Sequence, residues 1–367
     1  MNNSGIYDSK RGSEILFAAG ENIMKNGCYT ALITPFDDAG EIDNAGLEKL
    51  IDFQIQNGIT GILAAGTTGE SPTLKWEEHN LVADKIAAHT QGKCLSIAGA
   101  GSNNTAEALN AVEHAANIGF KSILLVDPYY NGPSSLEIRR EYYEPIAKAF
   151  PQMDIIPYII PGRTGAQMLP EDLAILADTY SNVSSVKEAT GSLENMEKTR
   201  KFCREGFKIF SGDDPMICEI MTAPSIKASG GISVMSNIAP RSLTQMIALL
   251  EKGDRDKALE IEKALSPLFN IVTITTEEDT CHGKVQCRAR NPLAVKTLMK
   301  ILGMPSGYCR KPMGKMTKKG IAIVENAAQQ IWNNNPEIFE PIADFFNVDI
   351  QERLGNQNLR KNLYYNY

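Results

Sequence analysis

Lys187 is the residue whose position most directly suggests chemistry. It lies in an extended-looking segment, Ser184 to Gly191, between two helical patterns. Side chains alternate along a strand, so in a closed barrel Lys187 faces opposite to Val186 and Glu188, and one of the two charges enters the interior. Burial lowers the pKa of a lysine, and the neutral amine can form a Schiff base with a ketone. The other interpretation is a lysine at a strand end, paired with a carboxylate and turned to solvent.

Two further segments carry polar groups that suit small anions. The turn Gly66-Thr67-Thr68-Gly69-Glu70-Ser71 offers amides and hydroxyls that can hold a carboxylate or a phosphate. An ordinary capping turn has the same composition. In the segment Tyr158 to Gly165, Arg163 suits bidentate binding of a carboxylate, and Tyr158 accompanies it. The alternative roles are a core tyrosine and a surface arginine.

These segments fall at the ends of predicted strands. Short runs of strand-forming residues alternate with helical runs at the spacing of βα units. The predicted strands are Cys28 to Phe36, Gly61 to Ala65, Cys94 to Ala98, Ser122 to Val126, Asp154 to Ile160, Ser184 to Ala189, Phe207 to Ser211 and Gly231 to Met235.

The helical runs place apolar residues on one face, as Leu47, Leu50 and Ile51 do. Asn104 is a predicted N-cap, with Glu107 as its capping carboxylate. Eight βα units over about 225 residues predict an α/β protein with a (β/α)8 TIM barrel, and an open doubly wound sheet is the alternative. In such a barrel the active site lies at the carboxyl ends of the strands, where the three polar segments fall.

The chain divides into three predicted parts. Residues 1–26 form a polar N-terminal extension, residues 27–253 the catalytic barrel, and residues 254–367 an all-helical C-terminal region. The predicted helices of that region are 256–268, 293–302, 318–333 and 337–346. A polar tail with three tyrosines, residues 356–367, is either free or docked on a neighbour.

Composition narrows the class of protein. The 367 residues are 43% hydrophobic and 22% charged, with a net charge of -7. Such an acidic chain attracts neither nucleic acid nor an anionic membrane, so a small-molecule enzyme is expected. Seven scattered cysteines predict reduced thiols, as in a cytoplasmic protein. Because the chain lacks a long apolar run, neither a signal peptide nor a membrane span is expected.

The motifs Gly-Thr-Thr-Gly-Glu and Val-Lys-Glu-Ala-Thr-Gly, with the tyrosine and arginine between them, resemble the dihydrodipicolinate synthase and N-acetylneuraminate lyase family of pyruvate-dependent class I aldolases. The resemblance covers about residues 28–294. It implies condensation of pyruvate with L-aspartate 4-semialdehyde to 4-hydroxy-tetrahydrodipicolinate, a step of lysine and diaminopimelate biosynthesis, without a cofactor. It also implies a homo-oligomer, a dimer of dimers.

The resemblance implies a role for each matching residue. Lys187 is the Schiff-base lysine, and Arg163 binds the carboxylate of the semialdehyde. Thr67, Tyr158 and Tyr130 form a hydroxyl proton relay, to which Tyr130 is donated across a dimer interface. Thr68 and the amides around Gly69 bind the carboxylate of pyruvate, and the carbonyl of Ile232 lines the pocket. Glu188 is expected to form an ion pair on the outer face.

The resemblance also implies a feedback site for L-lysine at a dimer interface. Ser71, Trp76, His79, Asn103 and Glu107 match its positions, with Trp76 in place of a histidine found in some members. An exposed helical His79 and a capping Glu107 are the alternative interpretation.

Other interpretations stay open at this point. One is a related pyruvate aldolase, such as a 2-keto-3-deoxygluconate aldolase or N-acetylneuraminate lyase, and another is a non-catalytic barrel with a binding or regulatory role. No metal site is expected, because Cys281, His282, Cys287 and Cys309 lack a usual zinc spacing. An insertion at about residues 273–290 has no assigned role.

Overall fold

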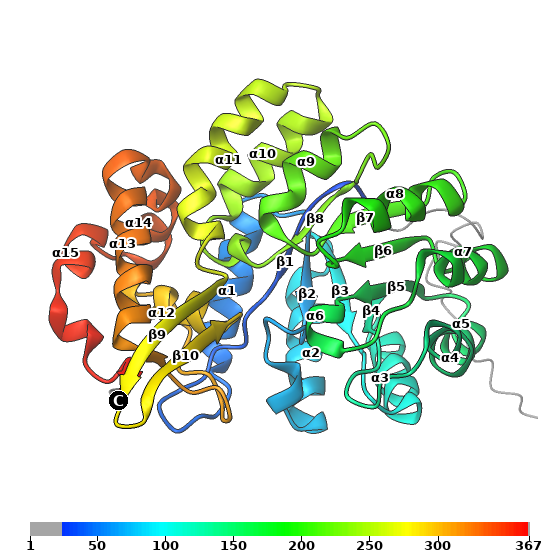
Figure 1. Ribbon diagram of the computed structural model, residues 1–367, viewed down its shortest axis with the longest axis horizontal. Coiled ribbons are helices and arrows are strands. Elements are labelled where there is room, and N and C mark those ends of the chain that lie inside the picture. Colours follow the sequence, from blue (N-terminus) through cyan, green and yellow to red (C-terminus); the bar gives the residue numbers. More distant parts are fainter. Residues whose placement is uncertain (1–23, 366–367) are drawn as a thin grey trace, which may run out of the picture.

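The computed structural model describes residues 24–365 of the chain (Figure 1). Most of the predicted N-terminal extension, residues 1–26, lies outside the described residues, as do the last two residues of the tail.

Eight parallel strands close into a barrel in sequence order, which confirms the predicted TIM barrel (Figure 1). The first strand pairs with both the second and the eighth. It ends at Ala31, five residues earlier than predicted. The strands are β1 (Gly27–Ala31), β2 (Gly61–Ala64), β3 (Leu95–Gly99), β4 (Ser122–Val126), β5 (Asp154–Ile159), β6 (Ser185–Glu188), β7 (Lys208–Ser211) and β8 (Gly230–Ser233).

Helices follow the strands and cover the outside of the barrel. Their buried residues recur at helical spacing, as Leu243, Met246 and Ile247 do in α10. They are α1 (Asn44–Gln56), α2 (Trp76–Thr90), α3 (Thr105–Asn117), α4 (Ser135–Glu137), α5 (Glu144–Ala149), α6 (Pro161–Thr164), α7 (Pro170–Thr179), α8 (Leu193–Phe202), α9 (Ile217–Thr222) and α10 (Pro240–Glu251). Short 3-10 or π turns lie at η1 (Ser71–Thr73), η2 (Ile138–Tyr143), η3 (Asp214–Met216) and η4 (Met235–Asn237).

The inside of the barrel is a separate apolar cluster. Tyr29 of β1 meets Phe210 of β7 edge to face, with ring centroids 5.5 Å apart. Leu63, Ile97 and Ile156, from the strands between them, complete the packing. The barrel is therefore filled with side chains, and its polar groups gather at one end.

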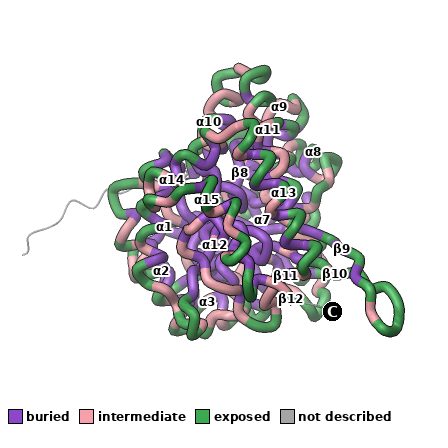
Figure 2. Tube along the Cα trace, turned by 90° about the vertical axis from the view of Figure 1, so that its left-hand side faces the viewer, coloured by how far each residue is buried: buried purple, intermediate pink, exposed green. Residues whose placement is uncertain are grey.

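The C-terminal region packs beside the barrel and starts with α11 (Arg255–Phe269), directly after Asp254. The prediction that this region is all-helical is wrong. The insertion forms an antiparallel hairpin of β9 (Thr273–Thr280) and β10 (Gly283–Arg290), whose tip projects into solvent (Figure 2). The other elements are α12 (Leu293–Leu302), β11 (Met316–Thr317), α13 (Lys318–Asn334), η5 (Pro336–Ile338), α14 (Glu340–Phe346), α15 (Ile350–Gly355), η6 (Gln357–Arg360) and β12 (Tyr364–Tyr365).

The hairpin forms because β9 alternates in strand fashion. Ile274, Thr276 and Glu278 are buried, and the residues between them are exposed. The acidic run Glu277-Glu278-Asp279 hid this pattern in the sequence, because charged residues are uncommon in strands. The tyrosine tail is docked on its own chain, where β12 pairs with β11.

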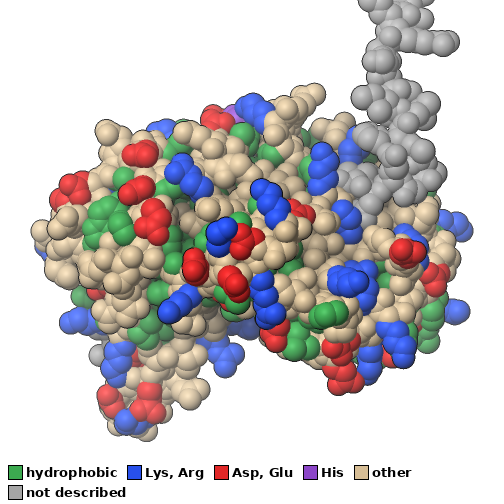
Figure 3. All heavy atoms as spheres, turned by 90° about the horizontal axis from the view of Figure 1, so that it is seen from above, with side chains coloured by type: hydrophobic (Ala, Val, Ile, Leu, Met, Phe, Trp, Pro, Cys, Tyr) green, Lys and Arg blue, Asp and Glu red, His purple; other side chains and the backbone are tan. Residues whose placement is uncertain are grey.

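Within residues 24–365, no helix has both the length and the apolar composition needed to cross a membrane. One face of the molecule shows acidic and basic side chains interspersed, rather than a broad region of one sign (Figure 3).

Candidate active site

Lys187 projects into the barrel from β6. Its neighbours across the sheet are Tyr158 on β5 and Phe210 on β7. The lysine is 3% exposed, and its Nζ lies 4.1 Å from the centroid of the Tyr158 ring. The alternation that the sequence predicted therefore places the amine, rather than the carboxylate of Glu188, in the interior.

The surroundings of Lys187 favour its neutral form. Burial lowers its pKa to about 8, and the charge of Arg163 acts in the same direction. The carboxylates of Asp213 and Asp214, at the end of β7, oppose this shift. At neutral pH roughly a tenth of the amine is thus neutral and available as a nucleophile.

Glu188 does not form the predicted ion pair. Its carboxylate accepts hydrogen bonds from Thr190 N and Asn195 Nδ2, both at 2.6 Å. The helix α8 follows β6 at once and carries Asn195, so the carboxylate is buried beneath this helix. Burial raises the pKa of Glu188. Its role is to fix the turn that follows Lys187.

Tyr158 and Thr67 lie together at the mouth of the barrel. Burial raises the pKa of Tyr158 to about 12, and a side-chain hydrogen bond with Thr67 partly offsets this shift. The phenol therefore stays protonated at neutral pH, and it can donate a proton to a group bound above Lys187.

A cavity of about 240 Å³ opens at this end of the barrel. Thr67, Ser71, Tyr158 and Arg163 line it, so two of the three predicted segments meet at this cavity. Lys187, from the third segment, lies against the ring of Tyr158 in the cavity wall. Because Arg163 is only partly buried, its guanidinium reaches both the cavity and solvent.

Three of the predicted binding residues are buried at this end of the barrel: Thr68, Gly69 and Ile232. Thr68 is 2% exposed, and Ile232 belongs to the apolar cluster inside the barrel. The carbonyl of Gly69 accepts a hydrogen bond from Thr34 Oγ1 at 2.7 Å. A Cβ at Gly69 would lie 3.0 Å from the carbonyl oxygen of Leu32, so the turn leaves little room for a side chain there.

Asn291 connects two of the predicted residues, and the sequence analysis missed it. Its Nδ2 donates to Thr68 Oγ1 at 3.0 Å, and its carbonyl accepts from Arg163 Nη2 at 3.1 Å. Since the threonine oxygen accepts from Asn291, its own hydrogen is free to point at a ligand. The only signal in the sequence was the Asn-Pro-Leu that follows the insertion.

Glu70 ties the same turn to the C-terminal region. It lies at a φ of 58°, and its Oε1 is 2.6 Å from Nζ of Lys296 on α12. Both side chains are 1% exposed. The other carboxylate oxygen accepts from Arg310 N at 2.8 Å. This ion pair holds the segment Gly66 to Ser71, called the threonine turn below, against α12.

Tyr130 is not part of the cavity in a single chain. Its side chain is 91% exposed, and its φ of 76° is unusual for a residue other than glycine. The loop holds this conformation in part through the Tyr130 N to Thr164 O hydrogen bond of 3.3 Å.

The residues of the predicted lysine site lie on neighbouring elements without sharing one cavity. The ring centroids of Trp76 and His79 are 5.1 Å apart. His79 is 5% exposed, so the alternative of an exposed helical histidine is wrong. Asn103 Oδ1 accepts from Tyr129 N. Asn104 caps α3 as predicted, but Glu107 instead accepts from Ser102 Oγ at 2.6 Å.

No group of three histidine, cysteine or acidic side chains within residues 24–365 is arranged to hold a metal ion. Cys281 and His282 lie at the exposed hairpin tip, whereas Cys309 is buried near Glu70. The structure therefore separates the residues of the weak zinc pattern.

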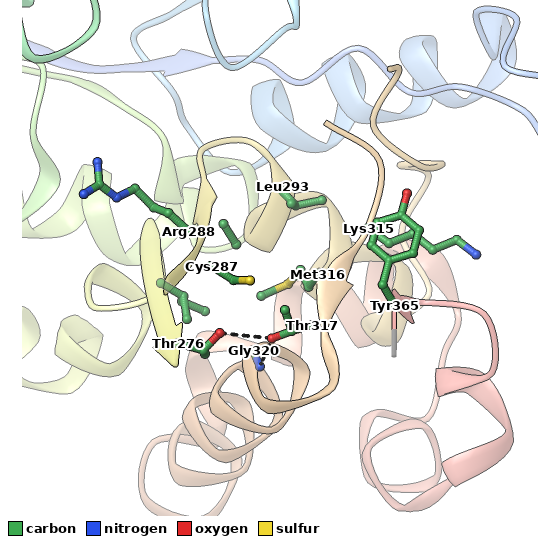
Figure 4. Close-up of a pocket in the computed structure, with 11 residues that line it drawn as sticks. Thr276, Cys287, Arg288, Leu293, Lys315, Met316, Thr317, Gly320 and Tyr365 are labelled. Atoms are coloured by element: carbon green, nitrogen blue, oxygen red, sulfur yellow. Dashed lines mark hydrogen bonds between the residues drawn. The ribbon is translucent and has the colours of Figure 1, made fainter. Parts of the chain in front are cut away.

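A second cavity, of about 510 Å³, lies between the hairpin and the start of α13 (Figure 4). There Thr276 and Thr317 form a hydrogen bond of 3.1 Å between their hydroxyls. This contact anchors the hairpin to α13, and the hairpin in turn leads into Asn291.

Comparison with known proteins decides the family. The sequence model of the Dihydrodipicolinate synthetase family matches residues 24–331. The chain belongs to this family. The predicted family is confirmed, and the match includes the hairpin and α12 as well as the barrel.

Three relatives illustrate the similarity. The 4-hydroxy-tetrahydrodipicolinate synthase of Methanococcus vannielii is 38% identical over 301 residues, which are 82% of this chain and 96% of the relative. The structure of the synthase from Methylacidiphilum fumariolicum SolV has a TM-score of 0.78 at 31% identity, covering 87% and 99% of the two chains. That of the Cyanidioschyzon merolae protein, solved with lysine bound, has a TM-score of 0.75 at 32% identity, covering 83% and 98%. The predicted enzyme class, a lyase, and the predicted activity agree with these names.

Proposed function

We propose that this protein condenses pyruvate with L-aspartate 4-semialdehyde to form 4-hydroxy-tetrahydrodipicolinate. The observation that carries the proposal is the buried Lys187, with its lowered pKa, in contact with Tyr158 at the mouth of the barrel. The names of the relatives and the family match support the same reaction.

The first step uses the neutral amine of Lys187. Its Nζ attacks the ketone carbon of pyruvate, and the carbonyl oxygen leaves as water to give an imine. The carboxylate of pyruvate would bind at the threonine turn, where Asn291 leaves the Thr68 hydroxyl hydrogen free. Loss of a methyl proton from the imine then gives the enamine that attacks the aldehyde.

Proton transfer requires a group that can give and take a proton beside the imine. Tyr158 fulfils this requirement, because its phenol lies against Lys187 and is hydrogen-bonded with Thr67. Tyr130 of a second copy would extend this relay, and its almost complete exposure in one chain supports that role. The proposed assembly is thus at least a dimer.

The second substrate carries a carboxylate, an aldehyde and an amine. Arg163 at the cavity wall would bind the carboxylate. The enamine carbon attacks the aldehyde carbon, and the substrate amine then displaces Lys187 from the imine carbon. This closes the ring of the product and restores the free lysine.

Trapping tests this mechanism. Borohydride with pyruvate should reduce the imine and leave a pyruvyl adduct on Lys187, located by peptide mass. Lys187→Ala should give no adduct and lose turnover by orders of magnitude while it stays folded. The matched control is Lys208→Ala, which changes a partly buried lysine on the neighbouring strand and should keep the adduct. A folded wild-type protein without any adduct would contradict the proposal.

We also propose that L-lysine binds near α2 and α3 where two copies meet. The edge-to-face pair of Trp76 and His79, together with Asn103 and Glu107, supports this site. A relative with lysine bound supports it further. Millimolar L-lysine should partly inhibit the enzyme, and unchanged rates without calorimetric binding would contradict the proposal.

A further inference from the structure

Two arginines lie at the mouth of the proposed active site, and only one of them has a role so far. Arg163 lies on the short α6, and Arg290 is the last residue of β10. Their charges act on each other, since Arg290 lowers the pKa of Arg163, and both lower the pKa of Tyr158. Arg163 lines the cavity, and the hairpin thus places a second guanidinium beside the loop that carries it.

The two arginines are joined by reciprocal hydrogen bonds. Arg290 Nη2 donates to Gly162 O at 3.1 Å, and Arg163 Nη2 donates to Asn291 O at 3.1 Å. Each arginine therefore binds the backbone beside the other. A guanidinium has five donors, so several N–H groups on each remain for a ligand.

Neither guanidinium has a carboxylate partner within salt-bridge distance among residues 24–365, whereas Arg139 and Arg310 are each paired with one. Two like charges held side by side repel each other, and a shared anion relieves this repulsion. A carboxylate accepts bidentate pairs from guanidinium groups. The arrangement therefore matches a carboxylate bound between Arg163 and Arg290.

The position of Arg290 is fixed before any ligand binds. It pairs with Thr273 at the base of the hairpin, and the preceding Ala289 is buried. Buried Asn291 and the buried helix α12 follow it. Little backbone ordering is thus needed on binding, which favours affinity.

We infer that Arg290 is a specificity-determining residue, which together with Arg163 binds the carboxylate of the aldehyde substrate. The inference rests on the proposed function. A second cation favours an aldehyde that carries a carboxylate over a neutral polyol aldehyde, whose hydroxyls need no charge. It should not affect pyruvate, whose carboxylate is held at the threonine turn.

Steady-state kinetics of Arg290→Gln tests this inference. The KM for aspartate semialdehyde should rise roughly tenfold, as for loss of a charge-assisted hydrogen bond, with the KM for pyruvate unchanged. Arg290→Lys should recover part of the affinity, because it keeps the charge and loses the forked geometry. Borohydride trapping of pyruvate on Lys187 should proceed at the wild-type rate.

Arg288→Gln is the matched control. It removes the same charge two residues earlier on β10, where the side chain is exposed and its guanidinium points away from the nearby cavity (Figure 4). Its KM values should stay those of the wild type. An unchanged KM for the semialdehyde in Arg290→Gln, or an equal rise for both substrates, would overturn the inference. Wild-type protein that traps pyruvate but ignores the semialdehyde would instead overturn the proposed function.

Discussion

Lys187 and Tyr158 owe their proposed roles to one cause with opposite effects. Burial disfavours charge, so it lowers the pKa of the amine to about 8 and raises that of the phenol to about 12. At neutral pH the phenol is therefore uncharged, and roughly a tenth of the amine is neutral. The amine can attack, and the phenol can give a proton.

The pKa of Lys187 predicts how imine formation depends on pH. Below about 8 the reactive neutral amine decreases roughly tenfold for each pH unit, and above that pH it is the main form. The rate of pyruvate trapping at low substrate should therefore rise from pH 6 to 8 and then level off. Rapid-quench trapping with cyanoborohydride measures this rate. A rise that continues to pH 10 would show an ordinary lysine.

The sequence allowed Lys187 to be predicted because a charged residue in a short strand is conspicuous by itself. Thr67, Tyr158 and Arg163 could be predicted because each lies at the end of a strand, where barrels gather their chemistry. Asn291 and Arg290 could not, because their contacts with Thr68 and Gly162 span more than a hundred residues. No local pattern encodes such contacts.

At the scale of elements, the barrel strands were predictable and the hairpin was not. The strands carry β-branched and apolar residues, and one of them, Ser122 to Val126, has the predicted bounds. The hairpin instead carries charges on its exposed positions, and its buried face needs α13 as a partner. A two-stranded hairpin is marginal alone, so tertiary packing determined its structure.

The ion pair between Glu70 and Lys296 joins the turn after β2 to α12. We expect its loss to lower the free energy of unfolding strongly. Lys296→Ala leaves a buried carboxylate without its partner, which should cost about 3–5 kcal/mol of unfolding free energy. The double variant Glu70→Gln, Lys296→Met should lose less than the two single changes together. Urea unfolding measures each.

The control for this prediction is Lys257→Ala, which breaks an exposed pair between Lys257 on α11 and Asp254, the residue before this helix. Its unfolding midpoint should barely move. An equally small change for Lys296→Ala would mean that water replaces the buried pair.

At the scale of the whole molecule, one chain brings together only part of the proposed relay. Tyr130 projects into solvent, whereas Thr67 and Tyr158 line the cavity. A two-fold arrangement would let each chain supply its tyrosine to the other. The proposed activity would then belong to the assembly.

Mixing two defective variants tests this arrangement. Lys187→Ala should be inactive and Tyr130→Phe strongly impaired. Hybrid dimers place an intact Lys187 beside the partner's intact Tyr130, so random exchange should restore roughly a quarter of the sites. Activity after co-refolding, compared with each variant refolded alone, measures the recovery. No recovery despite hybrids seen by native mass spectrometry would place Tyr130 outside the relay.

The long sequence distance between the threonine turn and its supports also constrains synthesis of the chain. Thr68 and Glu70 are translated early, whereas Asn291, Lys296 and Arg310 emerge from the ribosome near the end. All eight barrel strands precede these residues. A nascent chain can thus assemble the scaffold first, and the pocket matures only when translation is almost complete.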